Sequence, residues 1–239
     1  MKNNRVAVIA AGGSGSRMGA SLPKQYIKIG GEPIIIHTLR QFTACDFDRI
    51  LALVPIDYVK YTTELLKEYE ISGVTVISGG KTRNDTILKA ISFLREQGEL
   101  DASTILLTHD SVRPFVTRRI IEENLEVCTS SGTCTTAIPA TDTIVMGGEE
   151  VEEIFDRSKM QLVQTPQTFK ALRFEEIYSS LTDEQKELAT DCTRLFTLAG
   201  EKVYTVSGDM ANIKLTYQSD IAFAEGYVKW LRKKAELEK

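Results

Sequence analysis

The sequence has few of the residues that build metal centres and disulfide frameworks. Among its 239 residues there are only two histidines, so a centre built from several histidine ligands is not expected. The four cysteines are scattered along the chain without C-x-x-C spacing: Cys45, Cys128, Cys134 and Cys192. We interpret them as reduced thiols, not as a disulfide framework or a zinc site.

A charge excess of one sign and long apolar runs are also missing. The formal net charge is only −4, so the sequence lacks the excess of basic residues that is typical of nucleic-acid-binding proteins. The longest apolar runs, such as Arg5–Ala11 and Pro33–Ile36, are far shorter than a membrane span, and residues 1–4 lack the apolar stretch of a signal peptide. We therefore expect a cytoplasmic protein without nucleic-acid or membrane partners. Its length and 42% hydrophobic content fit one α/β domain over residues 1–239.

Apolar runs alternate with amphipathic helical stretches over the first half of the chain. Strands are expected at Arg5–Ala11, Arg49–Val54, Val74–Ile77 and Ser103–Thr108, and helices at Pro33–Thr43, Val59–Tyr69, Thr82–Arg95 and Arg118–Thr129. This alternation predicts a mainly parallel sheet with helices on both faces. In such folds ligands gather at the carboxyl ends of the strands.

A glycine-rich turn, Gly12–Gly19, follows the first expected strand, with Lys24 five residues beyond it. Glycines let the backbone N–H groups approach a phosphate chain closely. The turn does not fit G-x-G-x-x-G, because three residues separate its last two glycines, nor a P-loop, because no lysine follows its last glycine. An NAD-binding enzyme is therefore disfavoured. Arg17 and Lys24 are placed to bind a triphosphate from two sides. The alternative to a phosphate-binding loop is an ordinary strand-to-helix connection.

Two further motifs follow expected strands, Gly79–Thr86 and His109–Pro114. In the second, Asp110 is suited to a divalent cation or a sugar hydroxyl and Arg113 to a phosphate, although a local Asp–Arg pair capping a turn is also compatible. His109 at a strand end is more typical of a structural role. The first motif leads into a helix, and its N–H groups either recognise a nucleoside or simply cap that helix.

The pattern changes from Ala140 to Thr168, where no helical period continues. Residues 143–155 resemble a short β-hairpin around Gly147, which is either a partner-binding arm of about residues 140–168 or a hairpin packed on its own subunit. Beyond it we expect helices at Ala171–Ser180 and Asp191–Ala199, a strand at Lys202–Val206 and a last helix beginning near Ser219. Lys214, before that helix, is by default a solvated charge.

Eight motifs in order give the chain a resemblance over nearly its whole length. They are Gly12–Lys24, Gly79–Thr86, His109–Pro114, Asp142-Thr143, Asp156-Arg157, Gln164–Gln167, Thr190-Asp191 and Asn212–Thr216. The sequence resembles the cytidylyltransferase family that includes the 2-C-methyl-D-erythritol 4-phosphate and ribitol-5-phosphate cytidylyltransferases. The resemblance implies a Rossmann-like nucleotidyltransferase fold, CTP as co-substrate, Mg²⁺, and a homodimer whose arm reaches the neighbouring active site.

The same resemblance implies roles for individual residues. The catalytic residues would be Arg17, Lys24, Asp110 and Lys214, and Asp110 is the candidate metal ligand. CTP would be held by Ala10, Ala11, Gly12, Gly13, Gly80, Arg83, Asn84, Asp85, Thr86 and Ser111. The acceptor phosphate would be held by Lys214 and by Arg157, which the partner subunit donates. Arg113, Thr143 and Thr165 would lie nearby and bind the same substrate.

The acceptor itself is less clearly indicated. Four stretches look more like the ribitol phosphate branch: Ala11-Gly12-Gly13, Arg83-Asn84, His109–Phe115 and residues 142–145. We therefore favour ribitol 5-phosphate or a related pentitol phosphate as the acceptor. Residues 156–159 are instead similar to the isoprenoid branch, whose acceptor is 2-C-methyl-D-erythritol 4-phosphate. A nucleotide-binding protein of the same fold without turnover stays open, because a fold alone does not establish catalysis.

Overall fold

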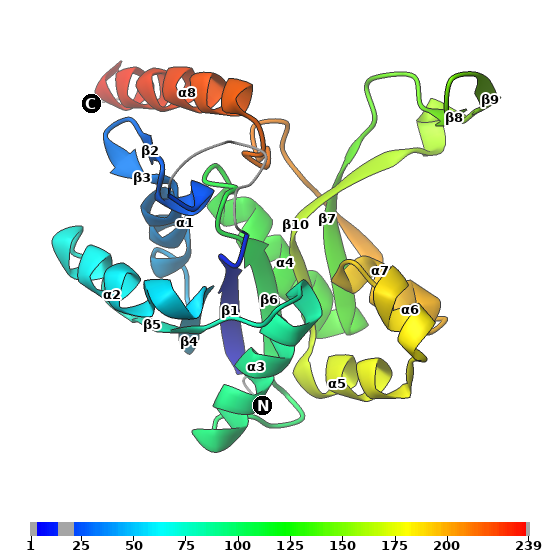
Figure 1. Cartoon of the computed structure of the whole chain (residues 1–239), viewed down its shortest axis with the longest axis horizontal. Coiled ribbons are helices and arrows are strands. Elements are labelled where there is room, and N and C mark those ends of the chain that lie inside the picture. The colour runs from blue at the N-terminus through cyan, green and yellow to red at the C-terminus, as the bar shows by residue number, and fades with distance from the viewer. Residues whose placement is uncertain (1–3, 14–21, 238–239) are drawn as a thin grey trace.

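The computed structural model describes residues 4–13 and 22–237, and its centre is a seven-stranded sheet (Figure 1). The strand order is β11 (Tyr204–Ser207), β7 (Thr133–Pro139), β10 (Gln161–Lys170), β6 (Ile105–Asp110), β1 (Arg5–Ala10), β4 (Arg49–Val54) and β5 (Val74–Ser78). Only β10 runs antiparallel to its neighbours β6 and β7. The expected mainly parallel α/β sheet is confirmed.

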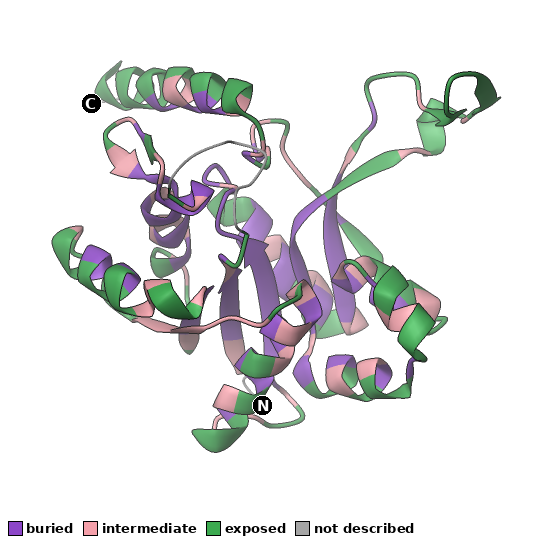
Figure 2. Cartoon of the chain, viewed as in Figure 1, coloured by how far each residue is buried: buried purple, intermediate pink, exposed green. Residues whose placement is uncertain are grey.

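Helices cover both faces because the central strands are apolar on both sides. In β1, Ala7 and Ile9 face a core shared with α1 (Ile34–Thr43), α2 (Val59–Glu68) and α4 (Arg118–Ser131). Val6 and Val8 face the opposite core, shared with α3 (Arg83–Glu96), α5 (Ala171–Ser180) and α7 (Cys192–Leu198). Figure 2 shows these strands almost wholly buried. Because each central strand is buried on both faces, its residues form a continuous apolar run in the sequence.

Several elements were not expected from the sequence. These are β7, β10, the short hairpin of β2 (Lys28–Ile29) and β3 (Glu32–Pro33), and α6 (Asp183–Leu188). The sequence signal of β10 is weak because its buried part carries polar side chains, such as Gln164, Thr165 and Gln167, whose polar atoms bond to other parts of the chain. β6 also ends two residues later than expected, so Asp110 is the last residue of the strand.

The segment between β7 and β10 projects from the body of the molecule (Figure 1). It contains β8 (Val145–Gly147) and β9 (Val151–Ile154), which pair as the expected hairpin, and the turn η4 (Arg157–Lys159). The expected range of 140–168 includes residues 164–168 of β10, which are buried in the main sheet. We therefore use the name arm for residues 141–163, which are mostly exposed.

Helix α8 (Gln218–Leu237) closes the fold on the side of the first hairpin. Its Ile221, Ala224 and Val228 pack with Ile29 of β2 and with Phe115, which lies in the segment after β6. The last helix thus covers the segment that carries the His109–Pro114 motif. Within the described ranges no helix is both long and apolar enough to cross a membrane.

Candidate active site

Two adjoining hollows lie at the carboxyl ends of β1, β5 and β6. The first hollow is lined by Ala10, Gly12, Gly13, Lys24, Gln25, Gly80, Lys81, Thr82, Arg83, Thr86, Asp110, Ser111, Val112 and Lys214. The second hollow is lined by Arg83, Asp110, Arg113, Val163, Gln164, Thr165, Gln167, Thr190, Asp191 and Lys214. Three residues, Arg83, Asp110 and Lys214, belong to both. The structure therefore brings three of the sequence motifs together around one carboxylate.

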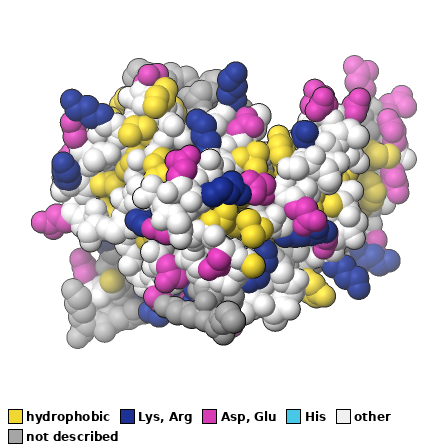
Figure 3. Space-filling model, turned by 90° about the horizontal axis from the view of Figure 1, so that it is seen from below, with side chains coloured by type: hydrophobic (Ala, Val, Ile, Leu, Met, Phe, Trp, Pro, Cys, Tyr) yellow, Lys and Arg dark blue, Asp and Glu magenta, His cyan; other side chains and the backbone are white. Residues whose placement is uncertain are grey.

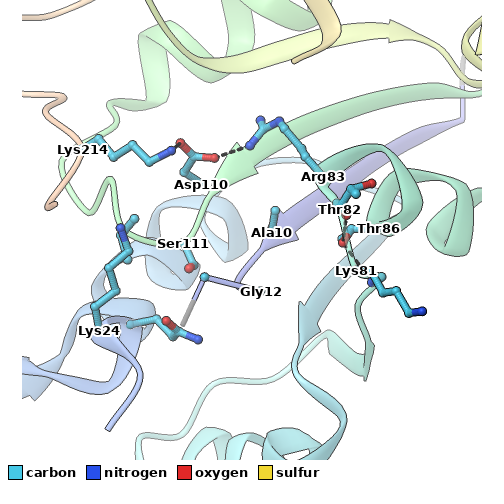
Figure 4. Close-up of a pocket in the computed structure, with 14 residues that line it drawn as sticks. Ala10, Gly12, Lys24, Lys81, Thr82, Arg83, Thr86, Asp110, Ser111 and Lys214 are labelled. Atoms are coloured by element: carbon cyan, nitrogen blue, oxygen red, sulfur yellow. Dashed lines mark hydrogen bonds and ion pairs between the residues drawn. The ribbon is translucent and has the colours of Figure 1, made fainter. Parts of the chain in front are cut away.

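Asp110 is the centre of a charged cluster. Its Oδ1 accepts a hydrogen bond from Arg83, its Oδ2 lies 3.0 Å from Lys214 Nζ, and Arg113 Nε is 3.5 Å from the same oxygen. Figure 4 shows Lys214 and Arg83 approaching Asp110 from opposite sides. Burial alone would raise the pKa of Asp110, but the three neighbouring cations hold it well below its usual range.

This cluster carries more positive than negative charge. Asp110 pairs with three cations, Asp191 is the second carboxylate of the site, and two nitrogen atoms of Arg83, Nε and Nη2, are buried without a hydrogen-bond partner. Buried cations without enough counter-charge are costly, so such a site favours an anionic ligand that supplies oxygen acceptors. The charge balance fits phosphate groups.

A buried hydrogen-bond network fixes the backbone that presents Asp110. The N–H of Asp110 donates to Thr165 Oγ1 over 3.1 Å, and that hydroxyl lies 3.0 Å from His109 Nδ1. His109 Nε2 lies 3.1 Å from the carbonyl oxygen of Arg113, which only accepts, so the ring proton is on Nε2 and the Thr165 hydroxyl donates to Nδ1. The structural interpretation of His109 is supported, and the hydroxyl of Thr165 is already used within the protein.

The buried His109 ring should make the protein less stable in mild acid. Burial lowers its pKa from 6.5 to about 4, so below pH 6.5 the unfolded chain binds a proton that the folded chain excludes. Stability due to this group is complete above pH 6.5 and is lost as the pH falls toward 4. We expect the free energy of unfolding to drop by about 2 kcal/mol between pH 7 and pH 4.5, measured by urea unfolding. His109→Gln should remove that part of the pH dependence, and an equal drop in the variant would assign it to other groups.

The first hollow is bounded on one side by a tight turn after β5. A Cβ on Gly80 would lie 2.3 Å from Asp85 Cβ and 2.6 Å from the carbonyl carbon of Asp85, so only glycine fits there. The Gly80 N–H donates to Thr86 Oγ1 over 3.0 Å, and Thr82 and Asp85 form a capping box at the start of α3. The helix-capping interpretation of this motif is supported, and Thr86 also lines the hollow.

Lys24 reaches the first hollow from the opposite side. It is 9% exposed, and its Nζ donates to the carbonyl oxygen of Leu215 over 3.2 Å. The N–H of Leu215 in turn donates to the carbonyl oxygen of Val112, two residues after Asp110. Lys24 is therefore not a solvated surface charge. It is tied to the same wall of the hollow as Lys214.

Some residues expected to bind ligand do not line either hollow. The N–H and carbonyl of Ala11 bond to Leu53 and Gln25, and Asn84 is buried with its amide donating to the carbonyl of Ala189. Asp85 is used in the capping box. Thr143 and Arg157 are exposed on the arm, where Arg157 Nη1 donates to the carbonyl of Thr141. Arg17 lies outside the described residues.

Other residues line the hollows without having been assigned a role. In the first hollow they are Gln25, Lys81, Thr82 and Val112, and in the second Val163, Gln164, Gln167, Thr190 and Asp191. Most belong to motifs already visible in the sequence, so motif membership was the signal that could have found them. Gln25 and Val163 are exceptions, because each lies just outside a motif and a residue beside a motif gives no sign of which way its side chain points.

Comparison with known proteins gives a consistent result. The sequence profile of IspD, described as 2-C-methyl-D-erythritol 4-phosphate cytidylyltransferase, matches residues 5–230. The structure resembles that of 4-diphosphocytidyl-2C-methyl-D-erythritol synthase from Anaerococcus prevotii, with a TM-score of 0.78, 26% identity and coverage of 95% of this chain and 96% of that one.

Two structures of 2-C-methyl-D-erythritol 4-phosphate cytidylyltransferases are also similar. The Thermus thermophilus protein gives a TM-score of 0.74 at 26% identity, covering 95% of this chain and 100% of that one. The Francisella tularensis protein gives 0.71 at 27% identity, covering 92% and 98%. With the sheet, the paired hollows and a profile match over most of its length, the chain belongs to the IspD family of CTP-dependent cytidylyltransferases.

Proposed function

We propose that this cytidylyltransferase transfers the cytidylyl group of CTP to D-ribitol 5-phosphate, or a closely related pentitol phosphate. A phosphate oxygen of the acceptor bonds to the α-phosphorus, the bond from that phosphorus to the β-phosphate oxygen breaks, and CDP-ribitol and pyrophosphate form. The observation that carries the proposal is the pair of hollows that share Arg83, Asp110 and Lys214. CTP takes the first hollow and the acceptor the second, so the reacting atoms meet beside Asp110.

The acceptor needs no strong base. A phosphate monoester has a second pKa of about 6 and is mostly dianionic at neutral pH, so its oxygen is already a nucleophile. The protein then has to position two anions and neutralise their charge. Lys24 and Arg17 act on the triphosphate, while Lys214 and Arg113 hold the acceptor phosphate.

The second hollow suits a polyol next to that phosphate. Besides its cations it carries the hydroxyl of Thr190 and the carboxylate of Asp191, while the amides of Gln164 and Gln167 are bonded within the protein and shape its wall. A hydroxyl and a carboxylate together donate to and accept from sugar hydroxyls. Supporting the ribitol branch, the strand-end sequence His109–Phe115 resembles that of ribitol-5-phosphate cytidylyltransferases.

Magnesium fits this site when it arrives with the nucleotide. Within residues 4–13 and 22–237 no three His, Cys, Asp or Glu side chains are arranged to hold a metal ion. Mg²⁺, however, is commonly bound through one or two carboxylates plus substrate phosphates, and Asp110 supplies such a carboxylate in both hollows. When bound, the ion neutralises charge on the triphosphate. Asp110 meanwhile keeps Arg83 and Lys214 in place.

We also propose a homodimer in which the arm completes the partner's site. Arg157 lies outside both hollows of its own chain, on an arm that leaves the body of the molecule. The arm also exposes apolar side chains, which in a monomer would remain in contact with water: Val145 is 48% exposed, Val151 61% and Ile154 65%. Exposed apolar patches of this kind mark interaction sites. A second copy would cover them and receive Arg157.

2-C-methyl-D-erythritol 4-phosphate is the alternative acceptor. The similar proteins from Thermus thermophilus and Francisella tularensis are 2-C-methyl-D-erythritol 4-phosphate cytidylyltransferases, and residues 156–159 of this chain resemble that branch. The sequence identity of 26–27% to these proteins is compatible with either ribitol 5-phosphate or 2-C-methyl-D-erythritol 4-phosphate as the acceptor.

Turnover with several acceptors tests the proposed function. We expect pyrophosphate release from CTP and Mg²⁺ with kcat/KM for ribitol 5-phosphate at least about 10-fold above that for 2-C-methyl-D-erythritol 4-phosphate, because a few hydrogen bonds to hydroxyls discriminate between polyols. Reactions without acceptor give the background. The reverse preference would make 2-C-methyl-D-erythritol 4-phosphate the acceptor. If no polyol phosphate raises pyrophosphate release above the acceptor-free background, the proposed substrate class is wrong.

A further inference from the structure

One face of helix α8 carries an exposed row of aromatic side chains. Phe223 and Tyr227 stack with ring centroids 5.8 Å apart, and Tyr227 stacks on Trp230 at 5.4 Å. Phe223 is 46% exposed and Trp230 52% exposed. The opposite side of the helix is already packed on the body through Ile221, Ala224 and Val228, so the aromatic row is not needed to hold the helix in place.

The same end of α8 is basic. Lys229, Arg232, Lys233 and Lys234 are exposed, and no acidic residue lies among residues 229–234. Beside the row runs a hollow whose lining includes Glu32, Arg40, Phe115, Tyr227, Leu231 and Arg232. Arg232 donates to the carbonyl oxygen of Gly30, on the side of α8 away from the row. We name the aromatic row together with Lys229, Lys233 and Lys234 the α8 face.

The tip of the arm, residues 145–154, has the complementary composition. Its only charged residues are Glu149, Glu150, Glu152 and Glu153, and all four are exposed. Figure 3 shows acidic side chains gathered at the right-hand edge of the molecule, the side on which β8 and β9 project in Figure 1. Val145 and Ile154 are cross-strand partners, so they project from one face of the hairpin as an apolar pair.

The placement of the two surfaces allows them to meet in a symmetric dimer. In Figure 1 the arm and α8 both lie beyond the carboxyl ends of the central strands, on the side of the active site. α8 begins four residues after Lys214, so a partner arm that presents Arg157 near Lys214 brings its tip toward α8. In a two-fold dimer each arm meets the other chain's helix, and the contact occurs twice.

We propose that the arm tip of each subunit docks on the α8 face of a second copy of this chain. Val145 and Ile154 cover the aromatic row, while the glutamates face Lys229, Lys233 and Lys234. The inference rests on the shared-site dimer of the proposed function and adds the surface that receives the arm. Apolar anchors in a pocket with a charged rim are the usual composition of a specific interface.

Trp230 supplies a direct probe, because it is the one tryptophan of the sequence. If the partner's arm covers it, dilution of the full-length protein through the dimer–monomer transition shifts its emission to longer wavelength and increases acrylamide quenching. Sedimentation velocity on the same samples gives the dimer dissociation constant. Emission that does not change while the dimer dissociates would overturn the proposal.

Charge exchange tests the pairing. Glu152→Lys with Glu153→Lys, or Lys229→Glu with Lys233→Glu, should each weaken the dimer at least about 10-fold, because several exposed pairs per dimer become repulsive. Combining both sets should restore the wild-type dissociation constant. The matched control for the lysine variant, Lys60→Glu with Lys67→Glu on α2, makes the same change in net charge and should leave the dimer unchanged.

The outcomes separate this inference from the proposed function. If the arm variant weakens the dimer, the lysine variant does not, and the combined variant shows no recovery, the arm packs elsewhere, for example on the other arm. A blue shift of Trp230 on vesicles of anionic phospholipid, with none on dimerisation, would assign the α8 face to a membrane surface. Pyrophosphate release measured on the same samples tests the reaction independently, since activity without charge-exchange recovery refutes only the docking surface.

Discussion

Lys24→Met should lower the turnover number about 100-fold while changing the affinity for CTP much less. Methionine keeps the length and apolar stem of a side chain that is 9% exposed, so the packing is largely preserved and the charge is lost. The lysine acts mainly on charge that develops on the triphosphate during transfer, and losing one such contact costs about 3 kcal/mol of barrier. Single-turnover pyrophosphate release and calorimetric CTP binding measure the two quantities.

The neighbouring Lys28 provides the control. It is exposed on β2 and lines neither hollow, so Lys28→Met should be as active as the wild type. Lys24→Ala should lose at least as much turnover as Lys24→Met. Near-normal turnover of Lys24→Met would remove Lys24 from catalysis and leave its bond to Leu215 as its role.

Arg157→Ala should be nearly inactive alone and should regain activity when mixed with an inactive Lys24→Met chain. Each site is expected to use Lys24 from one subunit and Arg157 from the other. A heterodimer of the two variants then has one site with both defects and one site with neither. After complete exchange at equal concentrations half the dimers are mixed, so activity should return to about a quarter of the wild-type value.

Tagged-chain capture shows whether the subunits have exchanged, and activity of the captured mixed dimers gives the result. Lys159→Ala changes a neighbouring cation of the same turn and should remain active alone. If mixed dimers are isolated and stay inactive, Arg157 acts within its own chain or not at all. The proposal that each active site is shared between two subunits would then be wrong.

Many of the elements that build the site could be predicted from the sequence. β1, β4, β5 and β6 were expected within two residues at each end because each is a short apolar run buried on both faces. The motifs at their carboxyl ends were expected to converge, and the paired hollows confirm that for the segments after β1, β5 and β6. Arg17 was expected to join them and lies outside the described residues.

β10 illustrates what the sequence pattern missed. Gln164, Thr165 and Gln167 look like loop residues, yet they belong to a buried strand between β6 and β7 because their polar groups find partners in other parts of the chain. The exposed apolar residues of the arm show the converse. Their pattern predicted a hairpin, but not that its apolar face would stand uncovered.

The sequence by itself determined the parallel α/β sheet, the hairpin, the order of the motifs and the cytidylyltransferase family. Only the tertiary structure decided that Asp110 lies among three cations, that the hydroxyl of Thr165 serves His109 and Asp110, and that Asn84 faces Ala189 and not the hollow. The physical reason is that periodicity reports which residues of one segment are buried. The partners of a buried polar group come instead from segments far apart in the chain, and folding alone brings them together.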